Sequence, residues 1–311
     1  MYSKINAYFQ NYETFSKWKE LYQVVSKIIN DKPKHVQIPG LVARAYGCEN
    51  ERVIAASACL ALVFSAVIIL DDLLDGDQRF SEGEAHLPDL ANMSAALVAL
   101  AFQTLQDFLV SEEDYQIGVS TLSEMLQNVA IGQALDVRNP CSEAEYWEVA
   151  RLKSGAFFSG AFALGGLVSG VGKGEYEVLR PLGREFGIMI QIHDDLRDSL
   201  EVPANPDWKN GRHSLPILFA ELVDHPWQER FKSIRSHVDD QKILSEAQQI
   251  LIQCGALSYG MHQIEQHYKN AMQQLGLLRI SNPAPLKSTF DELIDPVYRL
   301  VEKLLGSKLP N

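Results

Sequence analysis

The stretch VIILDDLLDGD, from Val67 to Asp77, joins a run of apolar residues directly to a cluster of aspartates. Upstream of the cluster, the segment from Ala55 to Leu70 has no charged side chain, and its only hydroxyl groups belong to Ser57 and Ser65. A membrane-spanning helix needs roughly 20 apolar residues, and this segment is shorter and ends in carboxylates. Charged residues are rarely buried without compensation. The stretch therefore predicts a buried helix, not a transmembrane one, whose acidic end needs a positive partner.

Three of the four aspartates in this stretch, Asp71, Asp72 and Asp75, have a spacing that suits a metal ion. On a helix, Asp71 and Asp75 lie one above the other on the same face, and Asp72 is rotated from them by about 100°. Three adjacent carboxylates repel one another, and the helix dipole disfavours them further at a carboxyl-terminal end. Sites built only from oxygen ligands favour Mg²⁺, Mn²⁺ or Ca²⁺ over Zn²⁺. On its own, however, such a motif is more often the solvated acidic end of a surface helix.

A second motif with the same spacing strengthens the metal interpretation. QIHDDLRD, from Gln191 to Asp198, carries Asp194 and Asp195 after the apolar segment Phe186–Ile192. We predict that the two helices face each other across a cavity and that Mg²⁺ ions between them bind a diphosphate. The apolar residues above the aspartates are expected to line a tunnel for an isoprenoid chain. The predicted metal ligands are Asp71, Asp72, Asp75, Asp194, Asp195 and Asp198.

Composition and charge narrow the class of protein. The chain has 311 residues, of which 46% are hydrophobic and 22% charged, a globular composition. The net charge of -12 argues against nucleic acid as a partner and means that an anionic substrate needs cations at its site. The four cysteines are scattered without a CxxC pair, which predicts free thiols in a reducing, cytoplasmic compartment.

Helical spacing dominates the rest of the chain. Apolar residues recur at intervals of three and four in the segments Leu179–Leu200 and Leu244–Leu275, and turns rich in Gly, Pro and Asn separate such segments. No linker is long or polar enough to divide the chain. We therefore predict an all-α fold, a single domain over residues 1–311 with about 10 to 13 helices around a central apolar cavity.

These features resemble those of the trans-isoprenyl diphosphate synthase (polyprenyl synthetase) family of class I isoprenoid synthases. The paired DDxxD motifs carry the resemblance, which covers roughly Gly47 to Pro216. The segments GQALD, RLKSGAFF, QIHDD and NGRHSLP are similar to further motifs of the family. By this resemblance, the ligands of the substrate diphosphate are Arg79, Gln133, Lys153, Gln191 and Arg212.

The resemblance also implies a mechanism. Mg²⁺, as three ions with the bound diphosphate and with Mn²⁺ as an alternative, helps an allylic prenyl diphosphate to ionise, and the double bond of isopentenyl diphosphate attacks the cation. The family further implies a homodimer. Catalysis is assigned to Asp71, Asp75, Asp194 and Lys153. The tunnel is assigned to Val63, Phe64, Ala66 and Val67, and the small or medium size of its aliphatic residues predicts chains of farnesyl size, fifteen carbons, or longer.

The site for the second diphosphate departs from the family pattern. DKPKHVQIPG, residues 31–40, replaces the family's Gly-Lys-Arg-x-x-Arg-Pro segment, and Phe64 stands where the family has a histidine. Only Arg79 follows the first motif, where the family has paired arginines. Because a second diphosphate needs cations, four interpretations stay open. They are chain elongation, which we favour; prenyl transfer to another acceptor such as a peptide tryptophan; cyclisation by a class I terpene synthase, a lyase; and a non-catalytic partner subunit.

Overall fold

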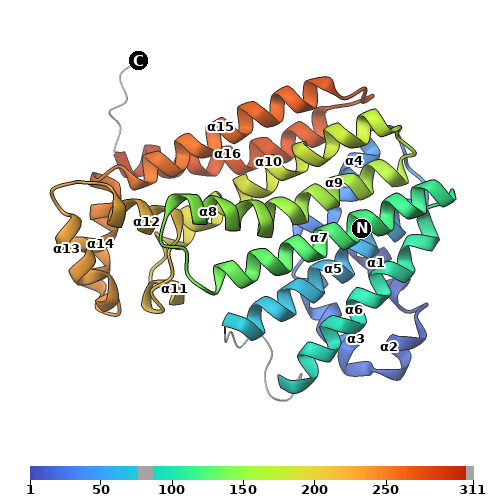
Figure 1. Cartoon of the computed structure of the whole chain (residues 1–311), viewed down its shortest axis with the longest axis horizontal. Coiled ribbons are helices and arrows are strands. Elements are labelled where there is room, and N and C mark those ends of the chain that lie inside the picture. The colour runs from blue at the N-terminus through green and yellow to red at the C-terminus, as the bar shows by residue number, and fades with distance from the viewer. Residues whose placement is uncertain (76–86, 306–311) are drawn as a thin grey trace. The chain divides into compact units, whose positions relative to one another are not determined.

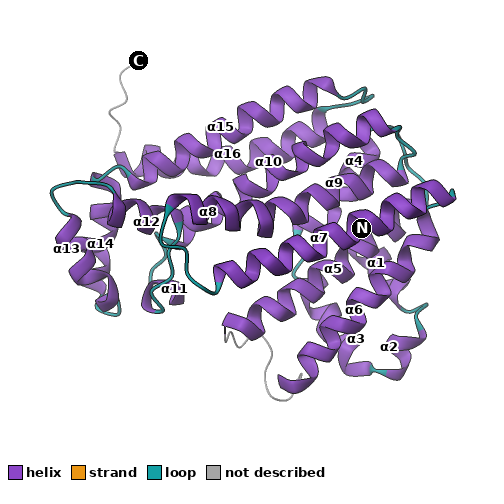
Figure 2. Cartoon of the chain, in the orientation of Figure 1, coloured by secondary structure: helices purple, strands orange, loops and turns teal. Residues whose placement is uncertain are grey.

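The computed structural model describes residues 1–75 and 87–305, and all regular structure in these residues is helical (Figure 2). They form sixteen α-helices, two short 3-10 helices and one π-helical segment (Figure 1). In chain order the α-helices are α1 (Tyr2–Phe9), α2 (Glu13–Lys17), α3 (Lys19–Asn30), α4 (Ile38–Ala45), α5 (Arg52–Asp75), α6 (Leu87–Phe108), α7 (Glu112–Asp136), α8 (Glu143–Ala150), α9 (Ala156–Val168), α10 (Lys173–Asp198), α11 (Pro206–Lys209), α12 (Leu215–Leu222), α13 (Gln228–Ile234), α14 (Gln241–Gln253), α15 (Ala256–Leu277) and α16 (Ala284–Leu305). The 3-10 helices are η1 (Lys34–Gln37) and η3 (Arg235–His237), and the π-helical segment is η2 (Arg151–Gly155).

The all-α fold class is confirmed, but the described helices outnumber the 10 to 13 that the sequence predicts. The excess comes from short helices such as α2 and α11, which have 5 and 4 residues. Helix α11 has the sequence PDWK, inside a segment with the residues of a turn. Helices this short are not stable by themselves, so they form only because the rest of the fold packs against them.

One compact unit consists of residues 1–129, 157–183 and 277–286. Its central helix, α5, packs along α6, where the Ser94 hydroxyl donates a hydrogen bond of 3.0 Å to the carbonyl oxygen of Ala66. Apolar residues lie on all faces of α5, as expected of a helix that is covered along most of its length, whereas Leu70 and Leu74 near its end are exposed. Of the described helices, only α5 is long and apolar enough to cross a membrane, but 72% of its most apolar window is buried inside the protein. The predicted buried helix is thus confirmed.

The other compact unit consists of residues 130–156, 184–276 and 287–311. Here α10 packs on α15 and α16: the rings of Phe186 and Phe290 have their centroids 5.0 Å apart, and Nδ1 of His267 lies 2.7 Å from the Glu185 carboxylate. Trp208 of α11 is buried. Each unit is assembled from separate stretches of chain, and α7 and α10 contribute residues to both. The single domain that the sequence predicts stays a prediction.

Candidate active site

Each aspartate motif forms the last turn of a long helix, as predicted. Helix α5 ends at Asp75 and α10 ends at Asp198. Asp72 is buried, with 4% of its surface exposed, and Asp71 is half-buried. The first motif belongs to the unit of α5 and the second to the unit of α15, and their position on two sides of one cavity stays a prediction. Arg79 and the side chain of Asp75 lie outside the described residues.

Aromatic rings surround Phe64, which lies two helical turns before Asp71 on α5. The centroid of its ring is 6.0 Å from that of Phe157 and 5.7 Å from that of His35. The His35 ring meets Phe158 edge-on at 5.1 Å. The segment that replaces the family's basic motif therefore contributes a packed ring at this position. We call these four side chains the ring cluster.

The predicted tunnel residues fall into two pairs. Val63 and Ala66 are almost completely buried, and the carbonyl oxygen of Ala66 accepts the hydrogen bond from Ser94 of α6. Phe64 and Val67 are half-buried. All four lie on α5 within the two turns before the aspartates. Their role as a tunnel wall stays a prediction.

In the second motif, a cation already lies between two of the aspartates. An Nη atom of Arg197 is 3.2 Å from Asp194 Oδ1, and the other is 2.9 Å from Asp198 Oδ1. Burial raises the pKa of the Asp198 carboxyl, and the Arg197 guanidinium opposes this rise. No three His, Cys, Asp or Glu side chains of the described residues form a ready-made metal group. Mg²⁺ in enzymes is held by one or two carboxylates with substrate phosphates, and these oxygens, which already share one cation, fit that role.

Asp195 has a different environment from its two neighbours. It is buried, and its Oδ2 accepts a hydrogen bond of 2.8 Å from the backbone N–H of Leu215, the first residue of α12. Its Oδ1 accepts one of 3.0 Å from Nε2 of Gln191. Burial raises the pKa of Asp195 to about 7, although both hydrogen bonds act against this rise. The side chain thus ties the start of α12 to α10, and a role as a metal ligand stays a prediction.

The environment of Asp195 predicts an unusual effect of pH on stability. In the folded chain the pKa of Asp195 is about 7, whereas the pKa of an aspartate in the unfolded chain is about 3.9. Between these two values the folded state binds more protons than the unfolded state, so the free energy of unfolding falls as pH rises. The contribution of the protonated Asp195 is complete below pH ~4 and is lost as pH rises through ~7. The total loss is on the order of 4 kcal/mol. In Asp195→Asn, the amides of Asn and Gln191 can reorient to keep the hydrogen bonds.

We therefore expect Asp195→Asn to unfold at higher denaturant concentration than the wild-type chain at pH 8 and at a similar one at pH 4. Urea unfolding at pH 4, 6 and 8 measures this. Asp224→Asn, at an exposed position, is the control and should follow the wild type throughout. If the stability of Asp195→Asn and that of the wild type changed with pH in parallel, the raised pKa of Asp195 would be contradicted.

Two glycines make room for the segment that carries Lys153 and Ser154. This segment, η2, is π-helical, a form that is rare and frequent at functional sites. A Cβ on Gly132 of α7 would lie 2.6 Å from the backbone nitrogen of Lys153, and one on Gly187 of α10 would lie 2.3 Å from the carbonyl oxygen of Ser154. Only glycine permits these approaches. The Ser154 hydroxyl then donates a hydrogen bond of 2.8 Å to Oε1 of Gln191.

Asp136 brings two of the predicted phosphate ligands together. Its carboxylate accepts a hydrogen bond of 2.8 Å from Nζ of Lys153, and its carbonyl oxygen accepts one of 2.9 Å from Nη1 of Arg212. Both cations are half-buried, and all three residues lie in one compact unit. Ammonium and guanidinium groups neutralise phosphate oxygens. The arrangement therefore offers two adjacent cations to an anion.

Gln133, one turn before Asp136, is buried with 6% of its surface exposed. Within the part of the chain that the structure describes, neither its Nε2 nor its Oε1 has a hydrogen-bond partner. An unsatisfied buried amide costs about 1–3 kcal/mol. This cost favours the predicted role as a ligand, because a polar group left without partners in the free protein is available to a substrate.

Three residues at this site were absent from the sequence prediction. Asn139 holds the backbone at Gly211 and His213, and Arg235 and Glu221 form a buried ion pair nearby. Asn139 has a left-handed backbone, with a φ of 61°, in the turn Arg138-Asn139-Pro140. This turn sequence is the one local feature that could have drawn attention to Asn139. The contacts of Arg235 depend on tertiary structure and leave no pattern in the sequence.

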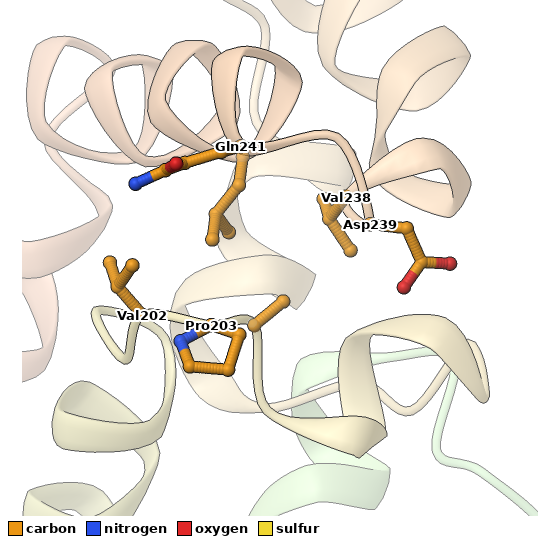
Figure 3. Close-up of a pocket in the computed structure, with 7 residues that line it drawn as sticks. Val202, Pro203, Val238, Asp239 and Gln241 are labelled. Atoms are coloured by element: carbon orange, nitrogen blue, oxygen red, sulfur yellow. The ribbon is translucent and has the colours of Figure 1, made fainter.

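A surface pocket of about 340 Å³ lies near the end of the second motif, between the segment after α10 and the start of α14 (Figure 3). The side chains of Val202, Pro203 and Val238 face this space, and Asp239 and Gln241 also line it. None of the predicted site residues lines this pocket. The pocket is therefore distinct from the site formed by Lys153 and Arg212 on Asp136.

The helical fold, with an aspartate motif at the end of each of two long helices, is that of an isoprenoid synthase. The polyprenyl synthetase family matches residues 19–251, and the chain belongs to this family.

Known relatives agree with this assignment. The short chain isoprenyl diphosphate synthase of Methanothermobacter thermautotrophicus is 27% identical over 258 residues, which are 78% of this chain and 79% of that protein. The octaprenyl diphosphate synthase of Escherichia coli is 24% identical over 252 residues, 76% and 77% of the two chains. The structure of geranylgeranyl pyrophosphate synthetase from Pyrococcus horikoshii covers 95% of this chain, and 94% of its own, with a TM-score of 0.77 at 20% identity. The chain is an enzyme, a transferase of the isoprenyl diphosphate synthase type.

Proposed function

We propose that the enzyme elongates an allylic isoprenoid diphosphate with isopentenyl diphosphate, in a Mg²⁺-dependent reaction, to products of farnesyl size or longer. The observation that carries the proposal is the pair of cations on Asp136, Lys153 and Arg212, in the same compact unit as the second aspartate motif. The relatives named above are synthases of short-chain and octaprenyl diphosphates. They support elongation but differ among themselves in chain length.

The reaction begins when the bond between carbon 1 and oxygen of the allylic substrate breaks. The electron pair leaves with the pyrophosphate, and Lys153 and Arg212 neutralise the charge that develops on it. The double bond of isopentenyl diphosphate attacks the allylic cation at carbon 1, and the new cation loses a proton to an oxygen of the released pyrophosphate, which forms the product double bond. The buried apolar residues of α5 are proposed to keep water from the cation.

Mg²⁺, when bound, supplies Lewis-acid stabilisation of the leaving pyrophosphate. We propose Asp71, Asp72 and Asp75 as its ligands in the first motif, and Asp194 and Asp198 in the second, with Asp195 as a further candidate. The solved polyprenyl synthase of Caulobacter crescentus, 21% identical with a TM-score of 0.69, is complexed with calcium and isoprenyl diphosphate. That complex supports the binding of both a divalent cation and a prenyl diphosphate. We also propose a cytoplasmic homodimer.

The proposal is tested by incubation with Mg²⁺ and farnesyl diphosphate, with and without isopentenyl diphosphate. We expect a longer prenyl diphosphate only when isopentenyl diphosphate is present. A hydrocarbon or terpene alcohol in both reactions would indicate cyclisation instead. Intact substrate in both reactions would indicate another acceptor or a non-catalytic subunit.

The ring cluster favours a second candidate, transfer of the prenyl group to an acceptor without a diphosphate. Phe64 stands where the family has a histidine, and its ring contacts those of His35 and Phe157, which in turn both contact Phe158. The three phenylalanine rings offer apolar surface and edge-to-face contacts to another ring, but they do not neutralise phosphate, and His35 is the one member of the cluster that can carry a positive charge. An aromatic acceptor, such as a tryptophan side chain, therefore suits these residues better than a diphosphate does.

Phe64→His tests which acceptor the ring cluster serves. If the enzyme elongates through a weakened isopentenyl site, the imidazole adds a hydrogen bond to a charged group, and KM for isopentenyl diphosphate should fall about 10-fold. Steady-state kinetics measures this, and Phe64→Leu, which removes the ring without adding a donor, is the control. An unchanged KM in both variants would count against elongation at this site.

A further inference from the structure

The loop between α11 and α12 carries Arg212 and is held at nearly every peptide. Asn139 Nδ2 donates to the carbonyl oxygen of Gly211 at 2.8 Å, and Asn139 Oδ1 accepts from the backbone N–H of His213 at 2.9 Å. The N–H of Arg212 donates to the carbonyl oxygen of Asp207 at 2.9 Å. The loop is short, and Gly211 has a φ of +71°, in the left-handed region. Its conformation is thus set by contacts on both sides.

Arg235 supplies the contact on the far side of this loop. Its Nη2 donates a hydrogen bond of 3.0 Å to the carbonyl oxygen of Arg212, and its Nη1 pairs with Oε1 of Glu221. The other oxygen of Glu221 lies 3.0 Å from Nε2 of His213. Only 9% of the Arg235 surface is exposed. One guanidinium therefore joins η3, α12 and the Arg212 loop in a buried position.

The ion pair of Arg235 and Glu221 is better suited to fixing the position of its neighbours than to stabilising the fold. Burying a charged pair brings little net stability compared with apolar residues of the same size, because both ions lose water. The planar guanidinium, in contrast, fixes two acceptors at a defined angle. Hydrogen bonds to Glu221 outweigh the effect of burial and hold the pKa of its carboxyl below the ordinary value, so it stays ionised near neutral pH.

We propose that Arg235 is a positioning residue that holds the backbone of Arg212, so that the Arg212 side chain meets the substrate diphosphate beside Lys153. The proposal rests on the proposed function, in which Arg212 binds that diphosphate. The backbone carbonyl of Arg212 is fixed by Arg235, and its guanidinium is fixed by the carbonyl of Asp136 at 2.9 Å. The residue between these two anchors has little freedom. Without Arg235, the Arg212 side chain must lose conformational freedom at the moment of binding.

Arg235→Lys tests the proposal with little change in charge or size. A lysine ammonium can pair with Glu221, but it lacks the planar fork that also reaches the Arg212 carbonyl. We expect the affinity for inorganic pyrophosphate in the presence of Mg²⁺, measured by calorimetry, to fall about 10-fold. We expect KM for the allylic diphosphate to rise by a similar factor. Arg230→Lys is the matched control, because Arg230 makes a two-pronged pair with Glu246 on the exposed surface of α13.

A double-mutant cycle separates positioning from general support of the fold. If Arg235 acts through the Arg212 side chain, Arg212→Ala combined with Arg235→Lys should bind pyrophosphate no more weakly than Arg212→Ala alone. Additive losses would overturn the proposal, as would unchanged affinity in Arg235→Lys. Asn139→Gly keeps the left-handed backbone and removes only the side-chain clamp, so it provides a second variant if Arg235→Lys unfolds at lower temperature. It should show the same non-additivity with Arg212→Ala.

The same measurements distinguish the inference from the function on which it rests. If Arg212→Ala, which removes the cation, binds pyrophosphate as tightly as the wild type, the role of Arg212 is wrong and the proposal for Arg235 falls with it. If Arg212→Ala binds more weakly but the loss is not coupled to Arg235→Lys, only the positioning role is wrong. Chain elongation is measured separately, with farnesyl and isopentenyl diphosphates.

Discussion

Asp194→Asn lowers the rate of prenyl transfer by a factor of about 10² to 10³, if the second motif stabilises the leaving pyrophosphate as proposed. Asp194 is half-buried at the end of α10 and shares the Arg197 guanidinium with Asp198. The amide of asparagine keeps the shape of the side chain but removes its charge. A divalent cation then loses one anionic ligand, and Arg197 loses one of its two partners. The measurement is the single-turnover rate of pyrophosphate release at saturating farnesyl diphosphate.

A matched control separates loss of the site from loss of charge. Asp224→Asn makes the same chemical change at an exposed position after α12, and it should leave the rate within about twofold, as surface changes usually do. Raising the Mg²⁺ concentration should recover part of the rate in Asp194→Asn and none in the control. A rate within threefold of the wild type in Asp194→Asn would remove the second motif from the proposed mechanism.

Gly187→Ala destabilises the enzyme and disables the site together. The added Cβ lies 2.3 Å from the carbonyl oxygen of Ser154 and 2.9 Å from the Cα of Gly155, and both are backbone atoms that no side-chain rotation can move. Helix α10 must therefore separate from η2. Overpacking of this kind costs about 1–3 kcal/mol of unfolding free energy. The separation also displaces Lys153 and breaks the bond between Ser154 and Gln191, and a misplacement of about 1 Å costs about 100-fold in rate.

Thermal unfolding and kcat/KM for the allylic diphosphate measure the two effects of Gly187→Ala. The control is Gly276→Ala, near the end of α15, where an added Cβ meets no atom within 4 Å. Because alanine is the better helix former, this control should be neutral or more stable by up to about 1 kcal/mol. Wild-type stability in Gly187→Ala would mean that α10 and η2 are not packed as closely as described.

The features that the sequence predicts are those that local pattern determines. The apolar run before Asp71 and the periodic segment before Asp194 predict two long helices, and both helices end at the aspartates. Motif resemblance singles out Lys153 and Arg212, which meet on Asp136. In these cases the signal lies within a few residues of the feature, because helix periodicity and capping are local properties.

The features that the sequence does not predict depend on residues that are distant along the chain. The Asp195 oxygen and the Leu215 N–H are 20 positions apart, and the guanidinium of Arg235 reaches Arg212 across 23. No periodicity or motif in the sequence indicates either of these two contacts. The ring of His35 packs against Phe158, although its segment suggests only scattered basic residues. Such contacts appear only once the helices have packed.

The guanidinium of Arg197 has a consequence for how the chain folds. A helix that ends in three aspartates collects negative charge from the side chains and from its own dipole. Without a cation, that end resists burial until a metal or substrate arrives. Arg197 carries the neutralising charge within the same turn, 2.9 Å from Asp198 and 3.2 Å from Asp194. Helix α10 can therefore form and pack without a bound metal, and the proposed Mg²⁺ would have to exchange with the Arg197 guanidinium at Asp194 and Asp198.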